Sequence, residues 1–311
     1  MKPIFIALLH QVEIAEDLGS GDKVNDTLRI TNNREVISRL IPHPFRSIMG
    51  EMEINSLLSG SPVVFAEAEW PMEMTPQQYL LTRLYEVQSF LMTTWVFLDN
   101  AINCEMGFLL YQLGDVSTAT SNFIAHLYSD CTAKKPSTKL SREQLREMRT
   151  LHRAKIRIPD HPFAFPTSQL TSAHPRLSRA FYIINAARGE QDIAIKVAHY
   201  CTAFETLFAT SQTELAHQLS ERIACYLFSG TEERLSAYRN IKSAYALRSK
   251  VVHGATLRDN KLNEALSTAV YCDGIARNVM KRLLTEPDAR KLFEQGTESF
   301  DETMLRTIFG A

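Results

Sequence analysis

The first 75 residues alternate between short apolar runs and turn residues, a pattern typical of mixed α/β structure. Three of the apolar runs predict β-strands, at residues 4–9, 27–30 and 63–70. Between the first two, Gly19 and Gly21 predict a turn. Residues 35–41 predict a short helix that ends before Pro42, because the residue preceding a proline favours extended backbone.

Farther along, the pattern predicts two helices and a hairpin. Thr75-Pro76 predicts the start of a long helix. Its apolar positions recur at helical spacing: Leu80, Leu84, Val87, Leu91 and Trp95. Two β-rich runs flank residues 112–115 and predict a hairpin. Residues 141–155 predict a basic helix that starts with a capping box. Its basic face is either an ordinary solvated surface or a surface that contacts RNA.

Four prolines at positions 159, 162, 166 and 175 interrupt the pattern and predict a domain boundary. Helical patterns then follow in close succession, at residues 176–187, 191–210, 214–229, 232–253 and 260–284. Because the turns between them are short, they predict an antiparallel helical bundle. We therefore expect an α+β chain with a mixed α/β domain at 1–156 that senses, regulates or recruits. A Pro-rich linker at 157–174, an all-α bundle at 175–285 and a tail at 286–311 complete the expected organisation.

Composition excludes disordered and fibrous classes, since 45% of the 311 residues are hydrophobic and 22% are charged. A chain of this length can bury a sizeable core. The net charge of −1 hides a moderately basic bundle, because residues 175–285 carry 15 Lys and Arg against 10 Asp and Glu. Any site for a polyanion must therefore be local.

Several well-known functional motifs are absent from the sequence. It contains no P-loop, no dinucleotide fingerprint, no HExxH zinc motif and no GxSxG nucleophile elbow. The five cysteines form no CxxC pair and the nine histidines lack metal-ligand spacing, so we expect no cofactor and no metal. The first residues lack the apolar run of a signal peptide, and no run approaches a membrane span. We expect a cytoplasmic protein that does not enter a membrane.

One segment of the fourth bundle helix places charge among apolar residues. Five positions spaced three and four apart share one helix face: Tyr238, Ile241, Tyr245, Arg248 and Val252. A guanidinium on that face needs an acidic partner or an external anion, because burying an unpaired charge is costly. His253 lies at the helix end, where the carbonyls favour an imidazolium, and Gly254 is a suitable C-cap.

Two further polar residues border the apolar faces of the preceding helices. Glu205 borders the face formed by Val197, Cys201, Phe204 and Phe208, and Arg222 borders the face formed by Leu215, Leu219, Ile223 and Leu227. The charges would be satisfied if Glu205 paired with either Arg248 or Arg222.

These three helices resemble the HEPN superfamily in its Apea-like branch. The resemblance lies in AFETLF at 203–208, LAHQLSERIACYL at 215–227 and IKSAYALRSKVVHG at 241–254. The family hallmark, an arginine followed after four to six residues by a histidine, is matched by Arg248 and His253. Residues 90–108 resemble, more weakly, the region that precedes some Apea-like domains. Arg146 and His152 match the same spacing outside the bundle, and we interpret that match as chance.

The resemblance implies a metal-independent endoribonuclease, often a toxin or antiphage effector, in which two subunits join their motifs in one cleft. Arg248 would hold the phosphate and His253 would transfer a proton, with Glu205, Arg222, Lys250 and Tyr245 in support. The implied partners are RNA, a second copy of the chain, and a regulatory protein or phage trigger. The alternative is a non-catalytic dimeric module that binds RNA or protein, in which Arg248 and His253 only hold the bundle together.

Overall fold

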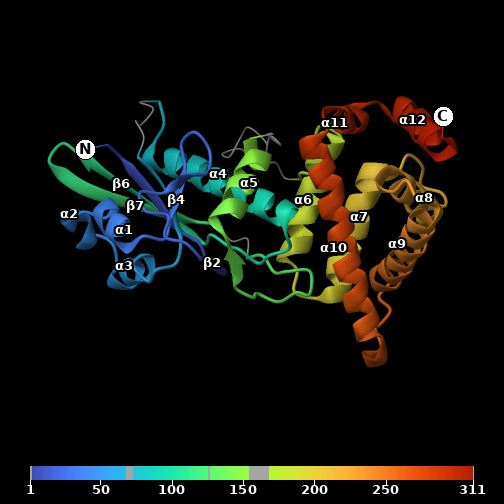
Figure 1. Cartoon of the computed structure of the whole chain (residues 1–311), viewed down its shortest axis with the longest axis horizontal. Helices are drawn as coiled ribbons and strands as arrows, with labels where there is room; N and C mark the ends of the chain where they lie inside the picture. Colours follow the sequence, from blue (N-terminus) through green and yellow to red (C-terminus); the bar gives the residue numbers. More distant parts are fainter. Residues whose placement is uncertain (1, 68–72, 125–126, 154–167, 311) are drawn as a thin grey trace. The chain divides into compact units, whose positions relative to one another are not determined.

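A computed structural model describes residues 2–67, 73–124, 127–153 and 168–310 of the chain (Figure 1). The chain forms two compact units. The first is built from Met1–Trp95, Asn100–Tyr128 and Lys135–Phe165. The second is built from Val96–Asp99, Ser129–Lys134 and Pro166–Ala311. The α+β class is confirmed, since an antiparallel sheet lies in the first unit and the second is helical.

The first unit is organised around a six-stranded sheet with the order β3-β4-β5-β1-β6-β7. Its strands are β3 (Asp22–Lys23), β4 (Arg29–Thr31), β5 (Val63–Glu67), β1 (Ile4–Leu8), β6 (Met106–Leu113) and β7 (Val116–Phe123). Every neighbouring pair is antiparallel. A separate parallel pair joins β2 (Val12–Ile14) to β8 (Thr138–Leu140).

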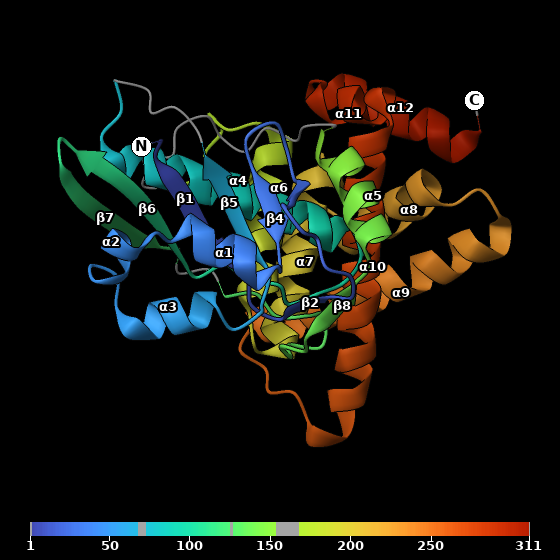
Figure 2. The same cartoon turned by 60° about the vertical axis from the view of Figure 1, so that its left-hand side comes forward.

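Helices cover both faces of this sheet (Figure 2). Ile4 and Ile6 of β1 pack in one core with residues from α1 (Arg34–Leu40), α2 (His43–Arg46) and α3 (Glu51–Leu57). On the other face, α4 (Pro76–Phe97) approaches so closely that a Cβ at Gly107 would lie 2.8 Å from a methyl group of Leu84. Burial on both faces explains why β1 is an uninterrupted apolar run instead of an alternating one.

Most predicted elements of the first unit are confirmed. The five periodic positions of α4 are fully buried, and the hairpin turns between β6 and β7 as expected. The basic helix is α5 (Arg142–Arg153), whose capping box joins Ser141 N to Gln144 Oε1 at 2.9 Å and Gln144 N to Ser141 Oγ at 3.2 Å. The predicted strand at 27–30 starts later, at Arg29, because the Asn25 side chain accepts from two backbone N–H groups in a turn. Residues 68–70 of the predicted third strand lie outside the described residues.

The second unit contains the five predicted helices with ends within a few residues of expectation. They are α6 (Arg176–Gly189), α7 (Ile193–Phe208), α8 (Leu215–Leu227), α9 (Thr231–Val252) and α10 (Leu262–Thr285). Helix α7 packs against the other four. The predicted apolar face of α7 is buried along its whole length, whereas α8 buries Leu219 and Ile223 fully and its two end positions only partly.

The expected tail at 286–311 is instead part of the helical unit. It forms α11 (Pro287–Glu294) and α12 (Thr297–Phe309), which bury Phe293 and Phe300. Phe293 packs edge-on against Phe208 and Tyr226 at centroid distances of 5.3 and 5.5 Å. The polar composition of these 26 residues concealed two short amphipathic helices whose few aromatic positions complete the core.

The boundary between the units differs from the sequence partition in one respect. Ser129–Lys134 and Val96–Asp99, assigned from sequence to the N-terminal domain, belong to the helical unit. Ser129 donates to Arg188 O and Glu190 O, which satisfies carbonyls at the end of α6. Residues 157–167 of the expected linker lie outside the described residues. Within the described part of the chain, no helix is long and apolar enough to span a bilayer.

Candidate functional site

The C-terminal end of α9 has a fully formed helix cap. The N–H of Gly254 donates to Val251 O at 3.0 Å, and the N–H of Ala255 donates to Lys250 O at 2.9 Å. Together these bonds form a Schellman motif. Gly254 adopts a φ of 74°, which a residue with a Cβ tolerates poorly. The cap therefore fixes the backbone of His253, the residue at the helix end.

Arg248 is held in place by two residues. Its Nη2 atom lies 3.2 Å from both carboxylate oxygens of Glu205 on α7. Its guanidinium carbon lies 5.4 Å from the ring centroid of Tyr245, within cation–π range. Side-chain exposure is 22% for Arg248 and 18% for Glu205, so the pair is only partly screened by water. Of the two pairings open to Glu205, the one with Arg248 is therefore the one that forms.

The same contacts perturb Tyr245. Burial raises the pKa of its phenol, and the nearby Glu205 carboxylate raises this pKa further by charge repulsion and by hydrogen bonding. The phenol therefore stays protonated and remains a donor to Glu205 at neutral pH. Glu205 thus joins Tyr245 and Arg248, which lie one turn apart on α9.

The buried face of α9 lies slightly to one side of the predicted stripe. Its buried residues are Ala237, Ile241 and Ala244, and Arg248 continues that row at the next position. Val252 was expected in the stripe but is 56% exposed at the last residue of α9. Tyr238 is half-buried, and its hydroxyl lies 2.8 Å from Nδ1 of His217.

The remaining predicted site residues differ in their surroundings. His253 and Lys250 are exposed at the end of α9. Arg222 is buried and bound elsewhere: Nη1 donates to Phe208 O at 2.8 Å and to Thr210 Oγ1 at 3.1 Å, and Nη2 pairs with Asp301 of α12. Among the described contacts, Arg222 has none with Arg248, Glu205 or His253. Its contacts join α8 to α12 and to the end of α7.

The arrangement at α9 combines a fixed cation with an exposed titratable group. Glu205 engages only Nη2 of Arg248, and the buried Nε has no hydrogen-bond partner among the described residues. An anion near Arg248 would therefore still find donors on the guanidinium fork. The exposed imidazole of His253 lies at the same helix end, where its ring nitrogens can donate or accept a hydrogen bond.

A second polar cluster, which the sequence pattern did not indicate, is buried in the same unit. The side chains of Lys196, Tyr200 and Asp273 are inaccessible to solvent. Tyr200 donates to Asp273 at 2.7 Å, Arg277 donates to the other oxygen of Asp273 at 2.7 Å, and Lys196 donates to Ala187 O at 2.8 Å. Lys196 and Tyr200 occupy positions that look apolar by spacing, so only the folded arrangement reveals the cluster.

Burial dominates the electrostatics of this cluster. It lowers the pKa of Lys196 to about 8, although the Asp273 charge opposes that change. It also raises the pKa of Asp99, with repulsion from Asp273 adding to the effect. A perturbed lysine is a candidate catalytic group when a substrate can reach it. Because Lys196 is fully enclosed, we assign the cluster a structural role.

Among the described residues, no group of three or more His, Cys, Asp or Glu side chains could hold a metal ion. A scan of the chain against protein-family models, a search of curated proteins and a search of solved structures each find no match.

The cap geometry predicts opposite effects for two glycine-to-alanine substitutions. Gly254→Ala should lower the free energy of unfolding by about 1–2 kcal/mol, because the φ of 74° is unfavourable for alanine. Gly274→Ala, in the interior of α10, is the matched control, because a Cβ there meets no atom within 4 Å. It should raise the free energy of unfolding by about 0.5–1 kcal/mol. Urea unfolding measures both, and a neutral or stabilising Gly254→Ala would contradict the assigned cap.

The burial of Lys196 predicts a pH-dependent stability difference. Its pKa falls from 10.5 in the unfolded chain to about 8 in the fold, so the folded state loses the proton first as pH rises. The associated stability is fully present above about pH 10.5 and is lost as pH falls through about 8. Relative to Lys196→Met, the wild type should therefore gain about 2 kcal/mol between pH 7 and pH 9.5.

The comparison of the two proteins separates the lysine from the buried thiols and phenols, because those groups are present in both. Loss of the Ala187 contact adds a constant offset that does not depend on pH. Urea unfolding at several pH values gives the difference, and a flat difference across this range would show that Lys196 is not desolvated.

Proposed function

We propose that this protein is a metal-independent endoribonuclease of the HEPN type that acts as a homodimer. The observation that carries the proposal is the end of α9, where an anchored guanidinium and an exposed imidazole lie within two helical turns. The Arg248–His253 spacing and the two preceding helices support the family resemblance, and residues 90–108 support it more weakly. The toxin or antiphage role, with a regulatory protein or phage trigger, is part of the same proposal.

In the proposed reaction, a 2′-hydroxyl of RNA attacks the adjacent phosphorus. One imidazole removes the proton of that hydroxyl, and a second delivers a proton to the departing 5′-oxygen. The products are a 2′,3′-cyclic phosphate and a free 5′-hydroxyl. Arg248 binds the phosphate oxygens and stabilises the charge that develops on them. Glu205 and Tyr245 orient Arg248, exposed Lys250 contacts a neighbouring phosphate, and Arg222 stabilises the fold.

The Glu205 contact favours a second candidate, a non-catalytic module. The ion pair with Glu205 alone can account for the position of Arg248, without any catalytic role. In that case Arg248 holds α9 against α7, and the dimer binds RNA or protein without cleaving it. The two candidates differ in what happens when His253 is removed.

Removal of His253 should abolish cleavage without disturbing the fold. His253→Ala is expected to lower the cleavage rate by about 10²–10⁴-fold, the usual contribution of acid–base catalysis. The unfolding midpoint should stay unchanged, because the side chain is exposed. His43→Ala, another exposed histidine, is the control and should cleave like the wild type. Cleavage of mixed RNAs, with end-group analysis and with EDTA present, measures the effect.

Two arginine variants sharpen this test. Arg248→Ala should also lose activity but should unfold more easily, because Glu205 then lacks its charged partner. Arg248→Lys should not restore cleavage, because an ammonium cannot reproduce the guanidinium fork. Wild-type cleavage by His253→Ala, or loss of wild-type cleavage in EDTA, would contradict the proposed mechanism and assign Arg248 and His253 a structural role. Absence of cleavage by the wild type would favour the non-catalytic candidate.

A composite site predicts that one defective protomer disables its partner. Each chain supplies one His253, and the proposed reaction needs one base and one acid. A two-fold axis near the end of α9 would supply both. A purified heterodimer of wild type and His253→Ala, selected with two different tags, should therefore cleave at least about tenfold more slowly than the wild-type dimer. Independent sites would retain half of the activity, and an active monomer in light scattering would also contradict the composite site.

A further inference from the structure

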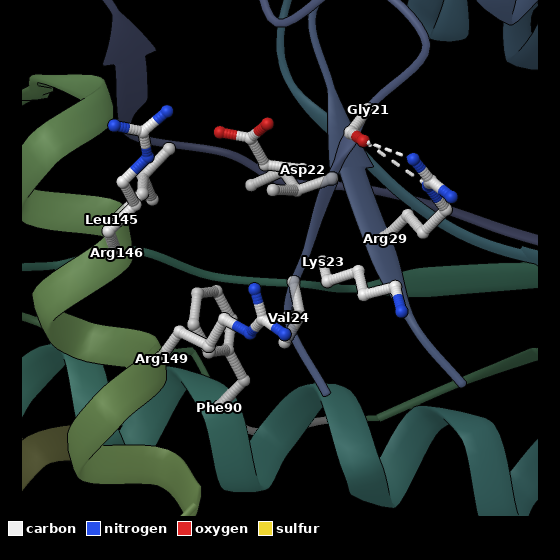
Figure 3. A pocket seen from close by; sticks show the side chains of 10 residues that line it. Gly21, Asp22, Lys23, Val24, Arg29, Phe90, Leu145, Arg146 and Arg149 are labelled. Atoms are coloured by element: carbon white, nitrogen blue, oxygen red, sulfur yellow. Dashed lines mark hydrogen bonds between the residues drawn. The ribbon is translucent and has the colours of Figure 1, made fainter. Parts of the chain in front are cut away.

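The first unit contains a cavity of about 270 Å³ whose lining is strongly cationic (Figure 3). Two of its arginines, Arg146 and Arg149, extend from α5 at one side of the cavity. Lys23 on β3 and Arg29 on β4 lie at the opposite side. Figure 3 shows that the side chains of Lys23 and Arg29 extend away from α5, and Lys23 is exposed. The positive charge that an anion would offset therefore comes mainly from Arg146 and Arg149.

The single acidic residue in the lining, Asp22, offsets only part of these charges. Asp22 is engaged by Arg142, which lies outside the lining: Nε contacts one carboxylate oxygen at 2.8 Å and Nη2 contacts the other at 2.6 Å. This bidentate pair lowers the pKa of Asp22 and keeps it ionised. Arg29 donates only to a neutral group, Gly21 O, at 3.2 and 2.7 Å. With four cations and one carboxylate in its lining, the cavity therefore keeps a net positive charge.

The side chain of Arg149 gives an independent indication that this cavity binds a ligand. Its Nε atom is buried and has no hydrogen-bond partner in the described part of the chain. A buried donor that stays unpaired destabilises the fold by about 1–3 kcal/mol. Binding sites often retain polar groups that lower the stability of the fold when no ligand is bound. Arg149 and Arg146 lie one turn apart on α5, so both can reach the same anion.

The apolar part of the lining indicates what else the ligand carries. Val24, Ile30, Phe90 and Leu145 complete the cavity around the cations. An inorganic ion would leave this apolar surface uncovered. The volume lies just below the range of about 300–1,000 Å³ for small-molecule pockets, which favours a small organic molecule over a polymer. A phosphate monoester carries a charge of about −1.5 to −2 at neutral pH, and arginine forks match its oxygens.

We infer that this cavity binds a small organic phosphate of about mononucleotide size, with Arg146 and Arg149 holding the phosphate group and Phe90 contacting the apolar portion. The site lies entirely within the first unit and does not depend on the proposed ribonuclease activity. It would give this unit the means to sense a phosphorylated metabolite.

Calorimetric titration of the full-length protein tests the inference with three probes. Adenosine 5′-monophosphate should bind with a Kd below 1 mM, inorganic phosphate should bind more weakly, and adenosine should not bind. Absence of heat for the monophosphate up to 1 mM, or equal binding of adenosine, would overturn the inference.

Three variants separate a binding role from a structural role. Arg149→Met should raise the Kd for the monophosphate by about 10–100-fold, because a charge-assisted contact is lost. Its unfolding midpoint without ligand should stay equal or rise, since an unpaired buried donor is removed. Arg146→Gln, at an exposed position, should weaken binding similarly. Arg239→Met, an exposed arginine of α9, should leave binding unchanged. Wild-type affinity in Arg149→Met, or a lowered midpoint with unchanged affinity in Arg146→Gln, would assign these arginines to the scaffold.

Discussion

The cost of removing a charged group from water governs where this chain places its functional side chains. Burying an unpaired charge lowers the stability of the fold by several kcal/mol. Each buried charged group is therefore expected to form an ion pair or hydrogen bonds, to become neutral, or to bind a ligand. Arg222 meets this requirement with two neutral oxygen acceptors and Asp301, and Arg248 meets it with Glu205. Lys196 meets it in part by a lowered pKa. The buried Nε of Arg149 has no hydrogen-bond partner among the described residues and lies at the cavity proposed to bind a ligand.

The sequence predicted those parts of the fold that depend on local periodicity and capping. The positions of α4, α7 and the β6–β7 hairpin follow from residues that are neighbours in sequence. The short strands β2, β3 and β8 were not predicted, because two or three residues carry no periodic signal. Helices α11 and α12 were missed for a related reason: charged residues dominate their composition, and only packing shows that Phe293 and Phe300 complete a core.

The domain boundary was harder to predict because a domain is defined by contacts and not by composition. The prolines near residue 160 marked a change in pattern, but Val96–Asp99 and Ser129–Lys134 contribute to the helical unit from far upstream. Ser129 satisfies carbonyls at the end of α6, and both oxygens of Asp99 accept from the N–H of Cys131. Cutting the chain at the proline segment would remove these contacts, so residues 175–311 alone are an incomplete unit.

For the candidate site, spacing placed Glu205, Arg222 and Arg248 beside the apolar helix faces but could not decide which arginine pairs with Glu205. The choice depends on an ion pair between α8 and α12. Arg222 of α8 pairs with Asp301 of α12, so Glu205 is available to pair with Arg248. Including α11 and α12 also changes the charge of the helical unit. Residues 175–311 carry 18 Lys and Arg against 16 Asp and Glu, so most of the basic excess of 175–285 is offset. The proposed binding of RNA would therefore depend on local groups such as Arg248 and Lys250 at the end of α9, and not on net charge.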